Sequence, residues 1–492
     1  MKKSTLYRLS YIYLALPLFI FFTTWLDFGI GLIVDLLYGF AFYKGFPKDG
    51  DENIIIDKKQ WIFLITISFI WCFCAGIGYF YYQSFDYHFK NAVFRDLINY
   101  DWPVFYDRAN TPMVYYAGFW LIPALIGKFL IFCGVGGHIS FIVANIFLLA
   151  ITILGTIIVF LHLINIIGNE NLKKVAIVIL GFIFFSGLDI VGYKYFTIMK
   201  QPFLHHLEWW ATFIQYSSIT TSMFWAFNQF IPVAILILTI YKEQNIKTFG
   251  LLILSSLFFA PYPTLTIGVI MVAITINKIL LSSNKIHFLI ENVFSITNII
   301  SVFWMLPIIV LFFITNSEGM YGYYYIFSYT TPVRLILFYI IEFLLYALII
   351  YPKYKKNLIF NVLLVGFFAI PFLRLDQQNN FCMRASIPLI ILFYCYIYSF
   401  IFDNKYKYSK YALILLLCIG ACTPIVEFYR GFYNITEQKK LNLTADEIYT
   451  LNNKYIRMPV FGFDVNHQYT AQNYKTDIFW QWFAKKTRGL ND

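Results

Sequence analysis

Long apolar runs recur along this chain from residue 9 to residue 428, and they constrain its fold more than any other feature. A helix that crosses a bilayer needs about 20 predominantly apolar residues. The composition agrees, because 60% of the 492 residues are apolar and only 13% are charged, against roughly 25% charged in soluble domains. A soluble multidomain enzyme, a disordered chain and a fibrous protein are therefore excluded. The runs are Leu9–Leu26, Phe28–Tyr43, Trp61–Tyr82, Val114–Phe132, Ile139–Ile167, Val175–Val191, Ser222–Tyr241, Phe249–Ala260, Thr264–Leu281, Leu289–Ile314, Val333–Tyr351, Leu358–Leu373, Ser386–Phe402 and Tyr411–Phe428.

Basic residues cluster in alternate gaps between these runs, and this bias predicts the orientation of the chain. Short loops rich in Lys and Arg stay on the cytoplasmic side, so we expect a cytoplasmic N-terminus and cytoplasmic gaps at Lys59 and Lys173. Three runs separate those two gaps, so strict alternation requires one of them, Val114–Phe132, to lie at the outer interface without crossing. The predicted fold is an all-α polytopic membrane protein with about 13 transmembrane helices and interfacial helices on the outer face.

The long polar gaps fall on the outer side together with the C-terminal tail. We predict a transmembrane domain over residues 1–428 and a small extracytoplasmic segment over residues 429–492, which is too short for an independent catalytic domain. The cytoplasmic loops are short and basic, so any chemistry is expected to face outward. The outer gaps are residues 83–113, 188–221, 316–332 and 374–384.

The first outer gap carries the candidate catalytic carboxylate. Apolar side chains at Phe89, Val93 and Leu97 are spaced four residues apart, which predicts an amphipathic helix over residues 86–98 lying in the membrane interface. Asp86 begins this helix beside an apolar wall, where a carboxylate can act as general base for a hydroxyl group. The alternative is that Asp86 caps the helix, since Asp is common at that position.

The second outer gap and the run after it place polar residues among Trp and Phe. Glu208 and Gln229 lie in such surroundings, which suit a pocket that stacks sugar rings and hydrogen-bonds their hydroxyls. An aromatic belt at the membrane interface explains the same composition. His205 and Glu208 share a helix face, but the adjacent His206 points about 100° away. A metal site is therefore not predicted here, although a need for a divalent metal stays open.

The third outer feature is a pair of arginines, Arg374 and Arg384, which flank an Asn- and Gln-rich turn between two apolar runs. A charge within a membrane helix costs about 2.5–3.5 kcal/mol, so it usually faces a cavity or a partner. The guanidinium group binds phosphate through paired hydrogen bonds. A single arginine is better explained by snorkelling to the interface, but two together favour a phosphate site.

Three segments resemble the multi-span GT-C glycosyltransferases, which take a sugar from a polyprenyl-phosphate donor at the outer leaflet. They are Gln83-Ser-Phe-Asp-Tyr-His88, the stretch from Met113 to Gly127, and Asn379-Asn-Phe-Cys-Met-Arg-Ala-Ser-Ile-Pro388. In such enzymes we expect a carboxylate within the last segment, where this chain has Asn380. The resemblance covers the general layout of most of the chain through short motifs.

This resemblance implies inverting sugar transfer, with Asp86 taking the proton of the acceptor hydroxyl and with Arg374 and Arg384 stabilising the departing lipid phosphate. The residues that would position sugar hydroxyls are His88, Glu208 and Gln229. The implied partners are a polyprenyl-phosphate sugar donor, a glycan or lipid acceptor and membrane lipids, with no nucleic acid and no certain cofactor. Abundant Ile, Phe, Lys, Asn and Tyr point to a bacterium, and hence to its cytoplasmic membrane, with the C-terminus extracytoplasmic.

Other functions fit parts of the pattern. A flippase for lipid-linked saccharides would line a passage with charges deep in its helices, and few charges lie mid-span here, Asp35 most clearly. A polysaccharide polymerase or ligase would use the same class of lipid-linked substrate, and the sequence does not separate it from a single-sugar transferase. An assembly partner without chemistry would not need clustered outer polar groups. No Walker-type phosphate loop supports an ATP-driven transporter.

Overall fold

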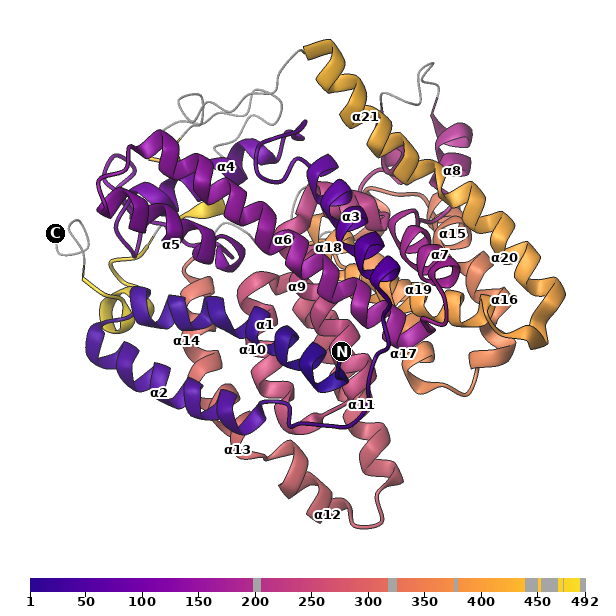
Figure 1. Ribbon diagram of the computed structural model, residues 1–492, viewed down its shortest axis with the longest axis horizontal. Helices are drawn as coiled ribbons and strands as arrows, with labels where there is room; N and C mark the ends of the chain where they lie inside the picture. Colours follow the sequence, from indigo (N-terminus) through magenta and orange to yellow (C-terminus); the bar gives the residue numbers. More distant parts are fainter. Residues whose placement is uncertain are drawn as a thin grey trace.

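The computed structural model describes residues 1–197, 205–316, 325–375, 379–438, 450–452, 468–471 and 473–486. These residues are mostly helical, and their only sheet is an antiparallel pair of two short strands, β1 (Phe105–Tyr106) and β2 (Thr111–Pro112). In Figure 1, α4, α8 and the end of α21 lie at the top, and α12 lies at the bottom. The α-helices are α1 (Lys3–Trp25), α2 (Phe28–Gly45), α3 (Lys58–Cys74), α4 (Tyr87–Asn99), α5 (Gly118–Phe132), α6 (Gly137–Ile167), α7 (Leu172–Ile183), α8 (Asp189–Phe196), α9 (Ile219–Glu243), α10 (Phe249–Phe259), α11 (Pro261–Leu281), α12 (Lys285–Phe288), α13 (Ile296–Ile299), α14 (Leu306–Ile314), α15 (Pro332–Tyr339), α16 (Leu345–Tyr354), α17 (Leu358–Ala369), α18 (Asn380–Ala385), α19 (Ile387–Ile401), α20 (Lys407–Gly420) and α21 (Cys422–Gln438).

Nine helical segments among these residues are long and apolar enough to cross a membrane. Some join two labelled helices through a π-helical turn, as α13 and α14 do over Ile296–Ile314. Three further apolar helical segments are shorter, namely Gly118–Phe132, Ile246–Phe259 and Leu358–Phe372. The expected all-helical chain with many membrane-spanning helices is confirmed, whereas the number of about 13 crossings stays a prediction.

Helix α5 covers most of the run expected not to cross. It has 15 residues and contains Pro123, so at 1.5 Å per residue it is about 22 Å long. The hydrocarbon core of a bilayer is about 30 Å thick. Helix α5 is therefore shorter than the hydrocarbon core, and its position at the outer interface stays a prediction.

Helix α9 forms the centre of the molecule, and 94% of its most apolar window is buried. Its backbone departs from helical geometry at Ala226, where φ is −143° and ψ is 36°, and it contains Pro232 one and a half turns later. Proline lacks the N–H that would bond to the carbonyl of Asn228. These two breaks open the helical hydrogen-bond ladder over one short stretch, so that outside donors can reach its backbone.

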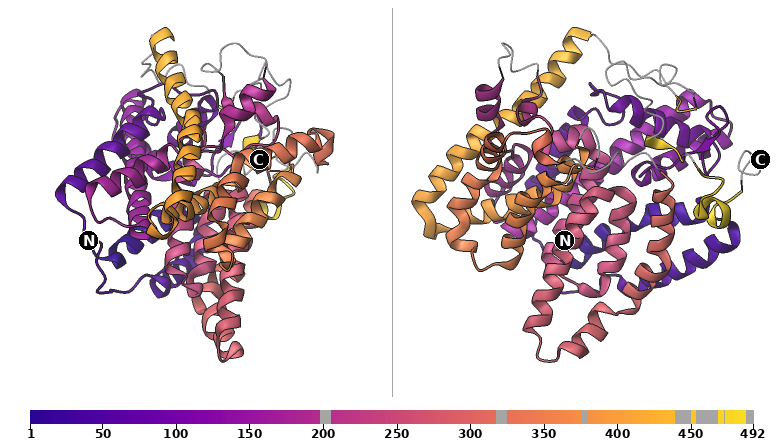
Figure 2. Two further views of the ribbon diagram at one scale, coloured as in Figure 1. Left: turned by 90° about the vertical axis from the view of Figure 1, so that its right-hand side faces the viewer. Right: turned by 180° about the vertical axis from the view of Figure 1, so that it is seen from behind.

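The ends of several helices lie on two opposite faces of the molecule. On one face, the start of α1 meets the end of α9, because the Tyr11 hydroxyl contacts Thr248 at 2.7 Å and donates to Glu243. We call this the N-terminal face. The opposite face carries α4, the two strands and the loops before α9, and both views in Figure 2 show α12 far from α4. We call it the outer face, after its predicted orientation.

The C-terminal residues return across the outer face. Val114 donates its N–H to the carbonyl of Tyr469 at 2.8 Å, and Ala471 donates to Pro112 at 3.0 Å. Farther along, Trp480 is buried and donates its indole N–H to Thr315. The described part of the tail therefore lies along the strand pair and the end of α14. Helix α21 runs through residue 428, the predicted end of the transmembrane domain, without a break.

The orientation of the two faces is testable by cysteine labelling. In a background with Cys133→Ser and Cys418→Ser, which removes two exposed thiols, we introduce Asp107→Cys on the outer face or Lys356→Cys on the N-terminal face. Both native side chains are exposed. A membrane-impermeant maleimide added to intact bacterial cells should label the first variant and reach the second only after permeabilisation. The reverse pattern would contradict the predicted orientation.

Candidate functional site

A tight turn after α3 places the first outer segment. Gly76 and Gly78 adopt φ of 77° and 87°, and a Cβ on Gly76 would lie 2.4 Å from a backbone oxygen, so this turn requires glycine. The side chain of Gln83 donates to the Gly76 carbonyl and accepts from Asn91, each at 2.7 Å. Tyr87 donates its hydroxyl to the Ala75 carbonyl at 2.7 Å. These bonds fix the start of α4 against the end of α3.

Asp86 immediately precedes α4 and is half-buried. Its side chain accepts no capping hydrogen bond, so the capping alternative is not realised in this structure. No hydrogen bond or ion pair between the described residues involves its carboxylate. Its charge instead acts on two cations, Lys90 and Arg384. A half-buried carboxylate that acts electrostatically on two cations, without an ion pair to either among the described residues, is thus the central feature of the site.

Lys90 lies one turn after Asp86 on the same side of α4, and its side chain is buried. Its ammonium group donates to the carbonyl of Trp225, next to the break in α9, and lies 4.8 Å from the Tyr87 ring centre. Burial lowers the pKa of Lys90 to about 8, although the charge of Asp86 acts in the opposite direction. Lys90 was not predicted from the sequence, although its spacing of four from Asp86 was a signal that could have identified it.

Arg384 reaches the same place from α18. One of its terminal nitrogens donates to the Tyr116 hydroxyl at 3.3 Å, while its Nε is buried and has no partner among the described residues. The guanidinium group offers five N–H donors in a planar fork. Most of these donors are therefore available to a ligand, and oxygens of a phosphate group match their geometry.

Tyrosine rings enclose the three charged groups. The ring centres of Tyr115 and Tyr116 are 3.9 Å apart, and those of Tyr115 and Tyr469 are 4.7 Å apart. Tyr469 also stacks on Phe89 of α4, and it interacts electrostatically with Asp86 and Arg384. The C-terminal segment thus contributes a wall to the site.

The structure places three other predicted residues apart from these contacts. His88 is exposed against the ring of Phe85, and partial burial lowers its pKa. Gln229 is buried in α9. The guanidinium carbon of Arg374 lies 4.0 Å from the ring centre of Phe213 and close to a tyrosine. No described contact joins these residues to Asp86, so their roles in substrate binding stay predictions.

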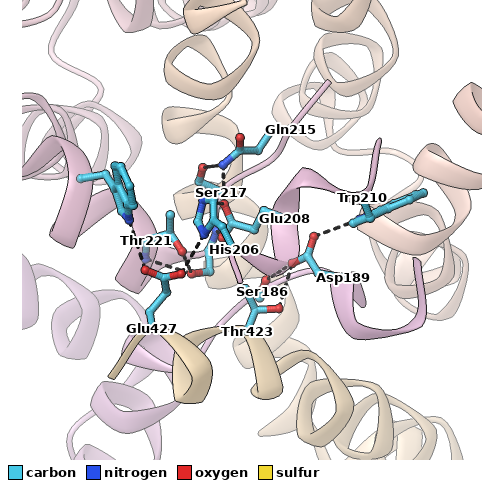
Figure 3. A network of polar contacts seen from close by, with 12 residues as sticks. Ser186, Asp189, His206, Glu208, Trp210, Gln215, Ser217, Thr221, Thr423 and Glu427 are labelled. Carbon is cyan, nitrogen blue, oxygen red and sulfur yellow. Dashed lines mark hydrogen bonds and ion pairs between the residues drawn. The ribbon is translucent and has the colours of Figure 1, made fainter. Parts of the chain in front are cut away.

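Glu208, the remaining predicted residue, belongs to a buried polar network at the base of the outer face (Figure 3). Its carboxylate accepts the backbone N–H of Ser218 at 2.8 Å and a bond from Gln215. The neighbouring His206 bonds through Nδ1 to Glu427 of α21 at 2.7 Å. All of these groups have partners, which supports a structural role for the network, and the role of Glu208 in sugar binding stays a prediction.

Burial and neighbouring charges together shift the pKa values of Glu208 and His206 in this network. Burial raises the pKa of Glu208 to about 7, against the attraction of His206. Burial acts to lower the pKa of His206, but the carboxylates of Glu427 and Glu208 outweigh it, so the pKa is raised. A second carboxylate, Asp189, accepts from Ser186 at 2.8 Å and lies in the same view (Figure 3). Among the residues that the structure describes, no group of three His, Cys, Asp or Glu side chains could hold a metal ion.

Trp225 joins this network to the charged site. Its backbone carbonyl accepts the bond from Lys90, and its indole N–H donates to Glu427 at 3.1 Å. Arg430 also donates a hydrogen bond to the Glu427 carboxylate, at 2.7 Å. The network therefore holds helix α21, the loop before α9 and the break in α9 as one unit below Asp86.

Comparison of this chain with protein-family models, with curated proteins and with solved structures finds no match. Electrostatic interactions link the predicted residues Asp86 and Arg384 with each other and with Lys90 and Tyr469, which the sequence did not predict.

Removal of Glu427 tests the structural role of the network. In Glu427→Ala the buried His206 and Arg430 lose their carboxylate partner, so the free energy of unfolding should fall by about 3 kcal/mol. Thermal and denaturant unfolding of the detergent-purified protein measure this change. The control is Glu170→Ala, which removes an exposed ion pair with Lys174 and should cost less than about 1 kcal/mol. Equal effects of the two substitutions would contradict the structural role.

Proposed function

We propose that this chain is a GT-C-type glycosyltransferase of a bacterial cytoplasmic membrane. It transfers a sugar from a polyprenyl-phosphate-linked donor to a cell-surface glycan or lipid-linked acceptor at the outer face. One observation carries the proposal: the carboxylate of Asp86 has no hydrogen-bond donor among the described residues, and its charge acts on both Lys90 and Arg384. Transfer of a sugar from a phosphate requires a base that accepts the proton of the acceptor hydroxyl, and cations that stabilise the departing phosphate.

The transfer has one bond formed and one broken at the anomeric carbon of the sugar. The acceptor hydroxyl oxygen attacks this carbon while the bond to the phosphate oxygen breaks with inversion. Asp86 takes the hydroxyl proton as the new bond forms. The electron pair of the broken bond stays on the lipid phosphate, whose extra charge Arg384 and Lys90 stabilise.

An apolar cavity would bind the prenyl chain of the donor. It has a volume of about 330 Å³ and lies between α3, α7 and α21. Helix α3 leads from this cavity directly into the turn before Asp86. The cavity is lined by Ile67, Ile70, Trp71, Ile183, Phe184, Ile425 and Phe428.

A polysaccharide polymerase or ligase would use the same charged site, because its donor carries the same lipid phosphate. The acceptor distinguishes these enzymes from a transferase of single sugars. A flippase is less well supported, since few charged residues lie in the middle of the predicted spans, Asp35 most clearly. The predicted roles of His88, Glu208, Gln229 and Arg374 in sugar and phosphate binding are part of the proposal and await mutation.

Donor binding separates the roles of Arg384 and Asp86. Native mass spectrometry of the detergent-purified protein should show a bound polyprenyl phosphate. Arg384→Ala should weaken this binding by about 10–100-fold, because hydrogen bonds to charged groups contribute about 1.5–3 kcal/mol. Asp86→Asn should bind the lipid phosphate and lose sugar transfer.

The control for this experiment is Arg95→Ala, which removes a half-buried arginine of α4 that pairs with Asp96. It should bind the donor as the wild type does. Equal binding by wild type and Arg384→Ala would contradict the phosphate site. A wild type that binds no polyprenyl phosphate would contradict the proposed function.

The pH dependence of donor binding tests Lys90. Its ammonium group is charged below its pKa of about 8 and loses its charge above it, so binding of the anionic lipid should weaken as the pH rises through 8. In Lys90→Arg the guanidinium stays protonated, and this loss of binding should disappear. Lys90→Met should bind weakly at every pH. The same pH profile in wild type and Lys90→Arg would contradict a role for Lys90 in binding.

A further inference from the structure

A second cavity, of about 970 Å³, opens on the N-terminal face, at the opposite end of the molecule from Asp86. The start of α1, the end of α2, the end of α9 and the residues around Ser295 form its walls. The proposed sugar transfer makes no use of it. Any ligand of this cavity therefore has a role other than donor or acceptor.

Positive charge exceeds negative charge in the cavity wall, since five lysines and three carboxylates line it. Lys3 pairs with Glu52, and Lys247 pairs with Glu291 outside the cavity. The lysines that have no carboxylate within ion-pair distance among the described residues are Lys44, Lys48 and Lys242. Unpaired cations around one cavity favour an anionic ligand.

A buried hydroxyl in the same wall also lacks a partner. Ser4 is 6% exposed, and its Oγ has no hydrogen-bond partner among the described residues. Buried polar groups in proteins nearly always have one. This Oγ is itself shielded from solvent, so the anionic ligand is assigned from the unpaired lysines and not from Ser4.

The surface next to the cavity favours a lipid over a soluble anion. Helix α2 exposes Leu36 (66%), Phe40 (45%) and Tyr43 (77%) along the face that no other helix covers. Lys44 follows directly, with its ammonium 5.6 Å from the Phe40 ring centre. A phospholipid with acyl chains along α2 would place its headgroup at the level of Lys44 and of the cavity mouth.

We propose that this cavity binds the phosphate group of an anionic phospholipid from the leaflet on the N-terminal face. Lys44, Lys48 and Lys242 supply the charge that balances the phosphate. The acyl chains stay in the bilayer beside α2. This binding is separate from the donor site and does not depend on the proposed transferase activity.

Lipid binding to the full-length, detergent-purified protein tests the assignment by native mass spectrometry with phosphatidylglycerol and phosphatidylcholine. Wild type should prefer phosphatidylglycerol. A triple variant with Lys44→Gln, Lys48→Gln and Lys242→Gln should lose on the order of a hundredfold in affinity, because each lysine near an anionic surface contributes about fivefold. Arg384→Ala, which alters only the donor site, should bind phosphatidylglycerol as the wild type does.

The matched control replaces three exposed lysines outside the cavity, with Lys285→Gln, Lys355→Gln and Lys356→Gln. It removes the same net charge and should keep the preference for phosphatidylglycerol. Equal losses in the two triple variants would overturn the site. Tight binding of soluble glycerol phosphate without any preference between the two lipids would overturn the assignment to a lipid.

Discussion

The hydrogen bond from Lys90 to the Trp225 carbonyl connects the parts of the outer face. A buried ammonium group needs an acceptor, and the break of α9 at Ala226 leaves a backbone carbonyl within its reach. Because α4 is held in this way, Asp86 at its start is held as well. The indole of Trp225 extends the same support to Glu427 and the buried network of α21.

The net charge of these residues suits the binding of a phosphate group. Asp86, Lys90 and Arg384 together carry one net positive charge in surroundings of tyrosine rings, where interactions between charges are stronger than in water. Asp86 alone neutralises one cation, and a ligand with a phosphate group would neutralise the other. The proposed reaction moves negative charge onto that phosphate, which increases its attraction to both cations as the transition state is approached.

The sequence predicted the elements that follow from hydrophobic pattern. The many apolar helices and the amphipathic α4 are found, since burial against lipid or protein gives apolar residues a period that a single sequence displays. Asp86 and Arg384 were paired in advance through a resemblance in their motifs. Lys90 and Tyr469 were missed because their position depends on the break in α9 and on the return of the C-terminal segment. Glu208 was interpreted as a ligand of sugar, and its buried partners, which come from distant parts of the chain, could not be seen in the sequence.

A structure of the protein bound to a polyprenyl phosphate in a lipid nanodisc tests the central claim most directly. We expect the phosphate oxygens within hydrogen-bonding distance of Arg384 and Lys90, with Asp86 facing the side on which a sugar would be attached. The prenyl chain should lie in the apolar cavity between α3, α7 and α21. A phosphate bound away from both cations, for example at Arg374 alone, would contradict the account.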